Sequence, residues 1–389
     1  CFTEDDIFQL VGNGDIEGVK ERIEMGADPN AVTDRGYTVL HIAAKSGSLE
    51  LVKYLVEKGA DPKPVDWYGY TVLHYASKSG SLEFVEYLVE KGADPTAVTD
   101  WGETVLHFGV GSRSLELVKY LIEKGTDPKA VDDIGYTLLH HAAESGSLEV
   151  VKYLVSKGAD PKAVNNDGRT ILHYAAESGS LEVVKYLVSK GADPKAVNND
   201  GRTILHYAAK SGLLELVEYL VKKGADPKVV TDYGSTVLHS AAESGSLELV
   251  KYLAENELDI KSQDEDYETV LHCAAGSGSL ELVEYLVSKG LNINAVDFYS
   301  DTVLYYAAES GSLEVVKYLL KMGADLKHAH YYDQTLLHYA AQSGSLELVE
   351  YLVNKGVEIS TKNYYGETAS DLAKNKNYSH IVAFLSKQQ

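Results

Sequence analysis

Apolar and polar positions recur along the chain in blocks that predict pairs of short helices. Near the start of the chain, Thr38 precedes an apolar cluster formed by Leu40, Ala43 and Ala44. A threonine hydroxyl accepts a hydrogen bond from a backbone amide of the first helical turn, so Thr38 is predicted as an N-cap. Gly47 then occupies a position where a left-handed residue ends a helix without steric cost. The pattern predicts a first helix between Thr38 and Gly47.

A second, amphipathic helix is predicted directly after this glycine. Ser48 is a suitable N-cap, and Glu50 places a carboxylate in the first turn, where the helix macrodipole favours negative charge. From Leu49 to about Lys58 the apolar side chains recur at intervals of three and four residues, which is the spacing of one helix face. Gly59 ends this helix, and a turn-rich extended stretch leads into the next pair.

The whole block repeats every 33 residues along the chain. Two neighbouring units are copies, because residues 142–176 match residues 175–209 letter for letter. Tyr305 takes the place of one marker histidine, and Phe8 and Asp371 occupy the equivalent positions in the first and last units. The grid has no insertion or deletion, so twelve units account for the chain. The marker is a Thr-x-Leu-His signal with His41, His74, His107, His140, His173, His206, His239, His272 and His338.

Stacking is the physical reason for such repetition. One pair of short helices cannot bury enough apolar surface to fold alone. Each copy can supply the missing wall of the copy before it, so stability becomes a sum of nearest-neighbour contributions.

The repeated unit D-x-x-G-x-T-x-L-H-x-A-A-x-x-G-x-L-E-x-V-x-x-L-x-x-x-G-A-D closely resembles the signature of the ankyrin-repeat family, over essentially all residues. The resemblance implies an all-α repeat solenoid, a curved array of helix-turn-helix units with hairpin-like finger loops, capped at both ends. One departure is uniform: Val, Ile or Leu stands where the family usually has Pro after the Thr. This removes some pre-organisation of the helix start and leaves the fold prediction unchanged.

We expect a single ankyrin-repeat domain over residues 1–389. Residues 1–33 lack the Thr-Leu-His signal and are predicted to form an N-terminal cap repeat. Residues 34–360 are internal repeats, and residues 361–389, with polar residues on the outer side, are predicted to form a C-terminal cap repeat. The array is therefore expected to be complete.

Composition narrows the classes of partner. The 389 residues are 44% hydrophobic and 24% charged, as in a folded protein, with a formal net charge of −22 at pH 7. This charge repels nucleic-acid phosphates and anionic membranes, and no basic patch offsets it. No apolar run approaches the roughly 20 residues of a membrane helix. We expect neither a nucleic-acid partner nor membrane insertion.

Two cysteines, Cys1 and Cys273, lie most of the chain apart, which excludes a disulfide framework. A reducing cytosol is the predicted setting. The resemblance to long ankyrin arrays also suits a scaffold, or an effector delivered into the cytosol of another organism. We expect a monomer.

The histidines invite a metal hypothesis that their spacing does not support. Neighbouring units stack at about 8–10 Å, whereas metal ligands converge within about 2 Å of one ion. The marker histidines are predicted to hydrogen-bond backbone in the adjoining hairpin. His328 and His330, with Asp333 nearby, are weak candidate ligands for zinc or nickel, and no fourth ligand is evident. No metal or cofactor is expected.

No constellation predicts catalysis. Every possible triad of Ser, His and Asp belongs to the repeating grid, whereas chemistry needs one distinctive site. The stretch from Gly109 to Ser114 faintly resembles a phosphate loop but lacks the later Gly and the Gly-Lys-Ser/Thr of a P-loop. Since Gly109 and Gly111 weaken a helix, a loosened repeat is the favoured interpretation. We expect that the protein is not an enzyme.

Exposed positions that differ between repeats are candidates for partner recognition. In ankyrin repeats the residue directly after each Leu-His pair faces the concave surface, so the resemblance implies a mostly aromatic surface there. Aromatic side chains near water are favoured binding anchors. We call these the post-histidine residues: Ile42, Tyr75, Phe108, His141, Tyr174, Tyr207, Ser240, Cys273, Tyr306 and Tyr339.

The tips of the inter-repeat hairpins form a second variable set, rich in aromatic and acidic residues. Two interpretations remain open: these aromatics bind a partner, or they stack on the next hairpin and stiffen the array. From both sets together we predict an N-terminal and a C-terminal partner-binding patch. Their residues are Trp67, Tyr68, Tyr70, Tyr75, Trp101, Phe108 and Tyr136, and Phe298, Tyr299, Tyr306, Tyr331, Tyr332 and Tyr339.

The hairpin glycine present from Gly36 to Gly234 disappears in three successive repeats, where Tyr267, Ser300 and Asp333 replace it. A left-handed bulky residue costs roughly 1–2 kcal/mol. We therefore expect these tips to rearrange, and units nine to eleven to form either a bend or a dedicated contact region.

The function predicted from the sequence is non-catalytic protein recognition. The concave face and the aromatic, acidic finger tips would bind a protein or peptide that carries basic residues among apolar anchors. The alternative is a mechanical or spacing solenoid without a dedicated binding site. A metal-dependent or enzymatic role has less support.

Overall fold

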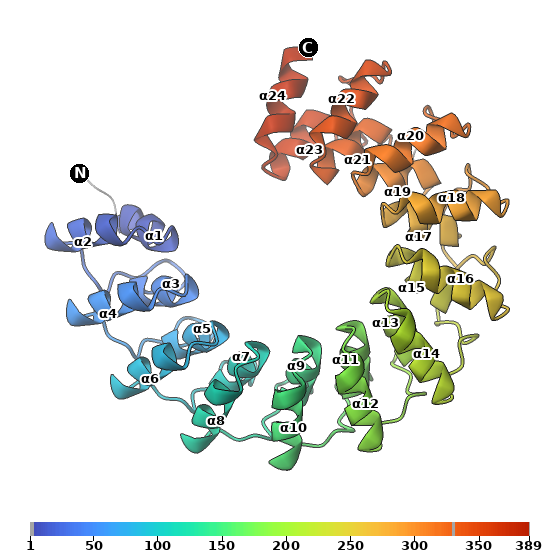
Figure 1. Cartoon of the computed structure of the whole chain (residues 1–389). Helices are drawn as coiled ribbons and strands as arrows, with labels where there is room; N and C mark the ends of the chain where they lie inside the picture. The colour runs from blue at the N-terminus through green and yellow to red at the C-terminus, as the bar shows by residue number, and fades with distance from the viewer. Residues whose placement is uncertain (1–3, 329–330, 389) are drawn as a thin grey trace. The chain divides into compact units, whose positions relative to one another are not determined.

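Each repeat folds into a pair of short helices followed by an extended hairpin that leads into the next pair (Figure 1). The structure, a computed structural model, describes residues 4–328 and 331–388. Isolated antiparallel bridges such as Val65 with Thr71 close the hairpins just before the first helix of a pair. The predicted all-α repeat solenoid is confirmed.

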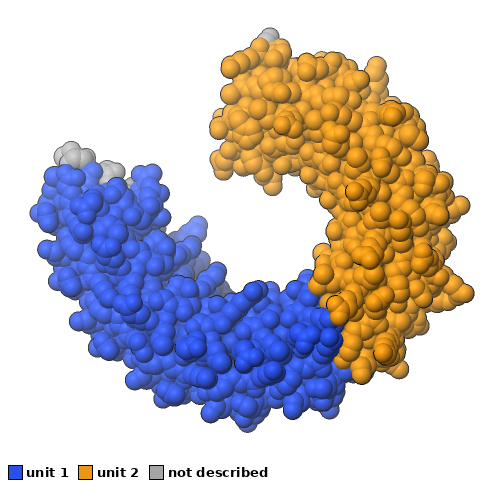
Figure 2. Space-filling model, in the orientation of Figure 1, with its two compact units in different colours: residues 1–193 blue, residues 194–389 orange. Residues whose placement is uncertain are grey.

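The chain divides into two compact units, Cys1–Asp193 and Pro194–Gln389 (Figure 2). The boundary falls in the hairpin between the two copied repeats. The first unit contains α1 (Glu4–Gly12), α2 (Ile16–Glu24), α3 (Val39–Lys45), α4 (Leu49–Glu57), α5 (Val72–Lys78), α6 (Leu82–Glu90), α7 (Val105–Gly111), α8 (Leu115–Glu123), α9 (Leu138–Ser145), α10 (Leu148–Ser156), α11 (Ile171–Glu177) and α12 (Leu181–Ser189).

The second unit has the same alternation of helices. It contains α13 (Ile204–Lys210), α14 (Leu214–Lys222), α15 (Val237–Glu243), α16 (Leu247–Glu255), α17 (Val270–Gly276), α18 (Leu280–Ser288), α19 (Val303–Glu309), α20 (Leu313–Lys321), α21 (Leu336–Ser343), α22 (Leu346–Asn354), α23 (Ala369–Asn375) and α24 (Ser379–Gln388). None of the helices in the described part of the chain is both long and apolar enough to cross a membrane.

Within each unit the odd-numbered first helices pack side by side, and the even-numbered second helices form the other layer (Figure 1). Small residues permit the close approach of the first helices, because Ala43 and Ala44 of α3 are buried. In α4 the buried stripe is Leu51, Val52 and Leu55. Each buried Leu or Val contributes on the order of 2 kcal/mol through the hydrophobic effect. The core is therefore a continuous seam between the two layers of a unit.

In many repeats a histidine in the first turn of the first helix joins its own repeat to the next. The Thr38 amide donates to His41 Nδ1 at 3.1 Å, which requires an unprotonated Nδ1, so Nε2 carries the proton. His41 Nε2 then donates to the carbonyl of Tyr70, in the following hairpin, at 3.1 Å. The equivalent bridges start from His140, His206, His239 and His338, and His272 Nε2 donates instead to the Ala295 carbonyl of the following hairpin.

For these six marker histidines the bridges confirm the prediction of a bond to backbone in the adjoining hairpin, whereas the buried Nε2 atoms of His74 and His107 have no hydrogen-bond partner among the described residues. Both ring nitrogens of a bridging histidine are occupied, so the ring cannot also ligate a metal. Tyr305, which replaces the histidine in α19, reaches the same region, since its hydroxyl donates to the carbonyls of His328 (2.7 Å) and Gln334 (3.3 Å). Tyr305 does not replace the capping role of the histidine. The Oγ1 atom of the N-cap residue Thr302, which bonds to the histidine in other repeats, is buried and has no hydrogen-bond partner among the described residues.

Burial lowers the pKa of these histidines and makes the fold sensitive to acid. The pKa falls from 6.5 to about 4 at His74, His107, His140, His206 and His272, chiefly through desolvation. Between these two values the unfolded chain binds more protons than the native chain. Stability is therefore fully present above about pH 6.5 and is lost as the pH falls toward 4.

We predict that the urea midpoint falls as the pH drops from about 6.5 toward 4. The fall should begin at a pH above the range in which carboxylates ordinarily titrate. Each buried histidine contributes on the order of 3 kcal/mol across its shift. Burial also raises the pKa of three carboxylates, Asp301 (to about 7), Glu144 and Glu268, which act in the opposite direction but are outnumbered by these histidines. In His140→Gln, glutamine can complete the capping box without titrating. Unfolding of this variant should therefore take up about one proton fewer, and its urea midpoint should depend less steeply on pH. Equal pH profiles for the variant and the wild type would contradict this explanation.

Three hairpins keep a left-handed backbone without glycine. At the usual position, Gly36 has a φ of +80°, and its replacements Tyr267, Ser300 and Asp333 have φ values of +60°, +65° and +55°. The expectation that these tips rearrange is wrong. The surrounding contacts hold the backbone conformation, for example a hydrogen bond from the Phe298 amide to the Asp266 carbonyl at 2.8 Å. These repeats therefore retain the cost of a left-handed side chain.

Tyr267→Gly should stabilise the protein by about 0.5–1 kcal/mol, the left-handed penalty minus the larger unfolded-state entropy of glycine. Tyr233→Gly is the matched control, because Tyr233 lies one hairpin earlier with 58% exposure against 56% for Tyr267, and its φ is not left-handed. The control should lose stability in the same urea titration. A loss in both variants would show that Tyr267 carries no backbone strain.

Candidate functional site

Hairpin tips in the first unit are built by a side-chain oxygen that accepts backbone amides, a carboxylate in the Asp66 hairpin, and neighbouring tips are joined by backbone hydrogen bonds. Asp66 Oδ1 accepts the amides of Tyr68 (2.8 Å) and Tyr70 (2.9 Å), which fixes the tip of the hairpin. The Asp100 amide of the next hairpin donates to the Tyr68 carbonyl at 3.1 Å. Gly69 permits this approach, because an added Cβ would lie 2.8 Å from the Asp100 nitrogen. The tips therefore lie in contact, each with a set orientation.

An aromatic cluster covers two adjacent tips. The rings of Tyr68 and Trp101 stack at 5.3 Å with an interplanar angle of 20°, and Tyr70 lies 5.7 Å from Trp101. The hydroxyl of Tyr70 donates to Glu103 Oε2 at 2.9 Å. Tyr68 and Trp101 remain 40% and 45% exposed. We call Tyr68, Tyr70 and Trp101 the N-terminal tip cluster; it is pre-ordered and open to solvent.

Other predicted residues of the N-terminal patch lie beside this cluster or apart from it. Phe108 packs edge to face on Tyr70 at 5.7 Å and continues the surface onto α7. Trp67 is 70% exposed and lies against Gly36 of the preceding hairpin. Tyr136 packs instead on His141 at 4.8 Å and on Tyr174 at 4.9 Å. The structure thus brings Tyr68, Tyr70, Trp101 and Phe108 together and places Trp67 and Tyr136 outside this group.

Post-histidine tyrosines brace the hairpins. Tyr75 Oη donates to Asp66 Oδ2 at 3.3 Å, Tyr306 Oη to Asp297 Oδ2 at 3.0 Å, and Tyr339 Oη to Asp301 at 3.0 Å. In the first two cases the acceptor lies nine residues before the tyrosine, in the hairpin of the same repeat. Burial raises the pKa of all three hydroxyls, so they remain protonated donors. Their hydroxyls act in the framework, while part of each ring stays accessible.

The C-terminal patch contains two tip groups. Phe298 and Tyr299 are 64% and 47% exposed, and their rings meet edge to face at 5.3 Å. Tyr332 meets Tyr331 at 4.9 Å and stacks on Tyr365 at 6.1 Å. Tyr365 and its neighbour Tyr364, which belong to the last hairpin, were not among the predicted site residues. The sequence could have identified both residues, because they are aromatic and lie at a predicted hairpin tip.

The weak metal candidate gains no support from the described residues. His330 lies outside them, and the backbone carbonyl of His328 is held by Tyr305. Asp333 occupies the left-handed hairpin position. Across the described parts of the chain, His, Cys, Asp and Glu side chains nowhere gather in a group of three or more that could hold an ion.

Comparison with known families agrees with the repeat signature. A family model described as ankyrin repeats (3 copies) matches residues 7–99, 106–198, 158–231, 190–264, 238–330 and 327–389. The matches extend over most of the sequence. Among curated proteins, none gives a significant match to the chain.

The stacked pair of the N-terminal tip cluster should couple the stability of two repeats. In a double-mutant cycle, Tyr68→Ala and Trp101→Ala should show a coupling of about 1 kcal/mol in urea unfolding. The control cycle pairs Trp67→Ala with Trp101→Ala, which should be additive because Trp67 lies against a different hairpin. Equal coupling in the two cycles would mean that the ring stacking adds nothing to stability.

Proposed function

Because the chain belongs to the ankyrin-repeat family, whose repeats generally mediate protein–protein interactions, we propose that it is a non-catalytic scaffold that binds a protein or peptide through its hairpin tips and first-helix face. The observation that supports this most strongly is the N-terminal tip cluster. Large aromatic side chains are held in a fixed arrangement and still face solvent, so binding orders few additional rotamers.

Charge defines the partner further. The tips carry Asp100, Glu103, Asp132 and Asp133 close to these aromatics, and the chain has a formal net charge of −22. A partner with lysine or arginine between apolar residues complements this surface and is steered toward it. The same field disfavours nucleic acid.

The titratable groups support a binding role more than a catalytic one. The histidines with depressed pKa values repeat along the grid, whereas catalysis needs one distinctive site. Burial raises the pKa of the Cys273 thiol well above 9, and its Sγ donates to Glu268 Oε1 at 3.0 Å. A thiol in this state is a poor nucleophile.

One observation also favours a spacer. The stacked rings of Tyr68 and Trp101 join neighbouring hairpins, as a stiffening element would. A spacer needs this stacking and no partner, so a binding experiment separates the two functions.

The experiment selects binders from a displayed library of random peptides on the immobilised intact chain. Fluorescence anisotropy then compares the affinity of a selected peptide for the wild type and for two variants, Tyr68→Ala with Trp101→Ala, and Phe298→Ala with Tyr299→Ala. One variant should bind at least about tenfold more weakly, as expected when interface anchors are removed.

The matched control replaces framework tyrosines on the second helices, Tyr87→Ala in α6 and Tyr120→Ala in α8, and should bind with wild-type affinity. Circular dichroism first establishes that every variant is folded. A library that yields no binder, or equal affinity for all variants, would contradict recognition through the tips and favour the spacer.

A further inference from the structure

Gly111 opens a pocket on the first-helix face of the first unit. At the equivalent place most repeats carry a long polar side chain, such as Lys78 in α5 and Glu144 in α9. Gly111 leaves this place empty, and an added Cβ would meet no atom within 4 Å. The resulting cavity of about 440 Å³ lies in the range of roughly 300–1,000 Å³ that ligand pockets occupy. Gly111 therefore shapes a surface, and α7 keeps the seven-residue length of α3 and α5.

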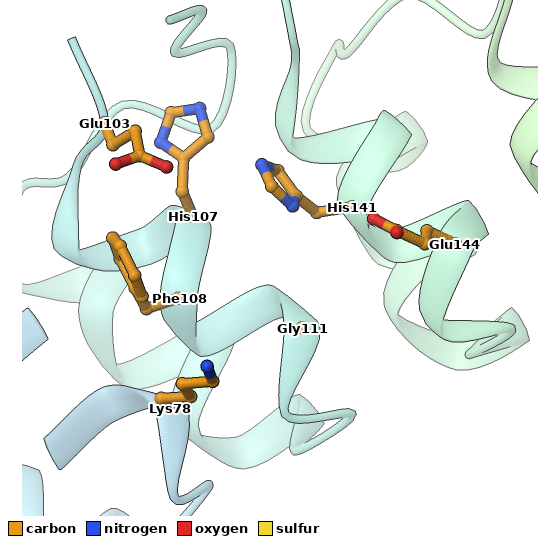
Figure 3. Close-up of a pocket in the computed structure, with 7 residues that line it drawn as sticks. All are labelled: Lys78, Glu103, His107, Phe108, Gly111, His141 and Glu144. Carbon is orange, nitrogen blue, oxygen red and sulfur yellow. The ribbon is translucent and has the colours of Figure 1, made fainter. Parts of the chain in front are cut away.

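Three successive first helices supply the walls. Figure 3 shows Phe108 and Lys78 on the α5 side of α7, and His141 and Glu144 on the α9 side. Edge-to-face packing on Tyr70 at 5.7 Å fixes the Phe108 ring. The pocket is thus continuous with the N-terminal tip cluster through Tyr70 and Phe108.

The charged groups of the pocket are one cation and two carboxylates, Lys78 against Glu103 and Glu144. Glu103 is held in place by the hydroxyl of Tyr70. Burial, together with repulsion from Glu177, raises the pKa of Glu144, and attraction to Arg169 offsets only part of this rise. A cation placed beside Glu144 would relieve both effects.

His141 supplies an unused polar atom. Its Nε2 is buried and has no hydrogen-bond partner among the described residues, which is an unfavourable state for a polar group. Figure 3 shows its ring reaching from α9 toward α7. Burial lowers the pKa of His141 to about 4, so the ring is neutral at pH 7 and adds no positive charge. The net formal charge of the pocket is therefore negative.

We propose that this pocket binds an arginine side chain of the protein partner; the inference rests on the proposed function. A guanidinium is planar, donates up to five hydrogen bonds and stacks on aromatic rings. Its positive charge complements the two carboxylates that line the pocket, and its donors and planar face suit the unpaired His141 nitrogen and the Phe108 ring. A carboxylate ligand would be repelled by Glu103 and Glu144, and an ammonium group lacks the planar face.

The test is an NMR titration of the intact chain with Nα-acetylarginine amide, observed at the imidazole of His141. The neutral citrulline analogue and the lysine analogue are the comparison ligands. The arginine compound should give a saturable shift, and each comparison ligand should bind at least about tenfold more weakly. No saturable shift, or equal affinity for citrulline or lysine, would overturn the proposal.

Gly111→Lys fills the pocket with the side chain that Lys78 provides one repeat earlier and adds a positive charge. It should reduce the affinity for Nα-acetylarginine amide at least about tenfold. The matched control is Gly276→Lys at the equivalent position of α17, where an added Cβ makes only an ordinary contact of 3.6 Å with Tyr306. The control should bind like the wild type, and an equal loss in both variants would overturn the assignment.

The two proposals fail separately. Selected peptides that bind Gly111→Lys with wild-type affinity would overturn the arginine pocket and leave partner binding intact. Saturable binding of Nα-acetylarginine amide, with no peptide recovered from the library, would support the pocket and contradict the proposed function.

Discussion

In the repeats that carry the marker histidine, this residue caps its own first helix with Nδ1 and, in the bridging repeats, holds the following hairpin with Nε2. In α3 this joins the Thr38 amide to the Tyr70 carbonyl through one buried ring. A local helix start is thereby coupled to a contact about 30 residues away. The bridge needs a neutral imidazole, so the same burial that strengthens the hydrogen bonds makes the fold sensitive to acid.

A framework held in this way leaves other positions free to vary. Hairpin tips stay stacked through backbone bonds such as that from Asp100 to Tyr68, whichever side chains they carry. This explains how Trp101 can remain both ordered and exposed. It also explains how Gly111 can lose the usual long side chain, opening a pocket while α7 keeps its length.

The fold was predictable because its determinants are local and repeat many times, so Thr38, Gly47 and Ser48 have equivalents that reinforce one interpretation. The tips were harder to predict. Tyr267 keeps a left-handed backbone because contacts with the neighbouring hairpins hold its conformation. The local steric cost of a left-handed tyrosine, which is all that the sequence shows, predicted the opposite. The pocket is lined by side chains from three repeats, and their arrangement in space cannot be derived from one position. From the sequence alone, Gly111 therefore indicated only a weakened helix.

The central claim is that recognition takes place on the hairpin tips and first helices, while the second helices serve the framework. Amide hydrogen exchange of the intact chain, with and without a peptide selected from the library, tests this most directly. The account predicts added protection in hairpin tips such as residues 66–70 and 99–103, or in odd-numbered helices such as α7 and α9. Protection confined to even-numbered helices such as α6 and α8 would contradict it.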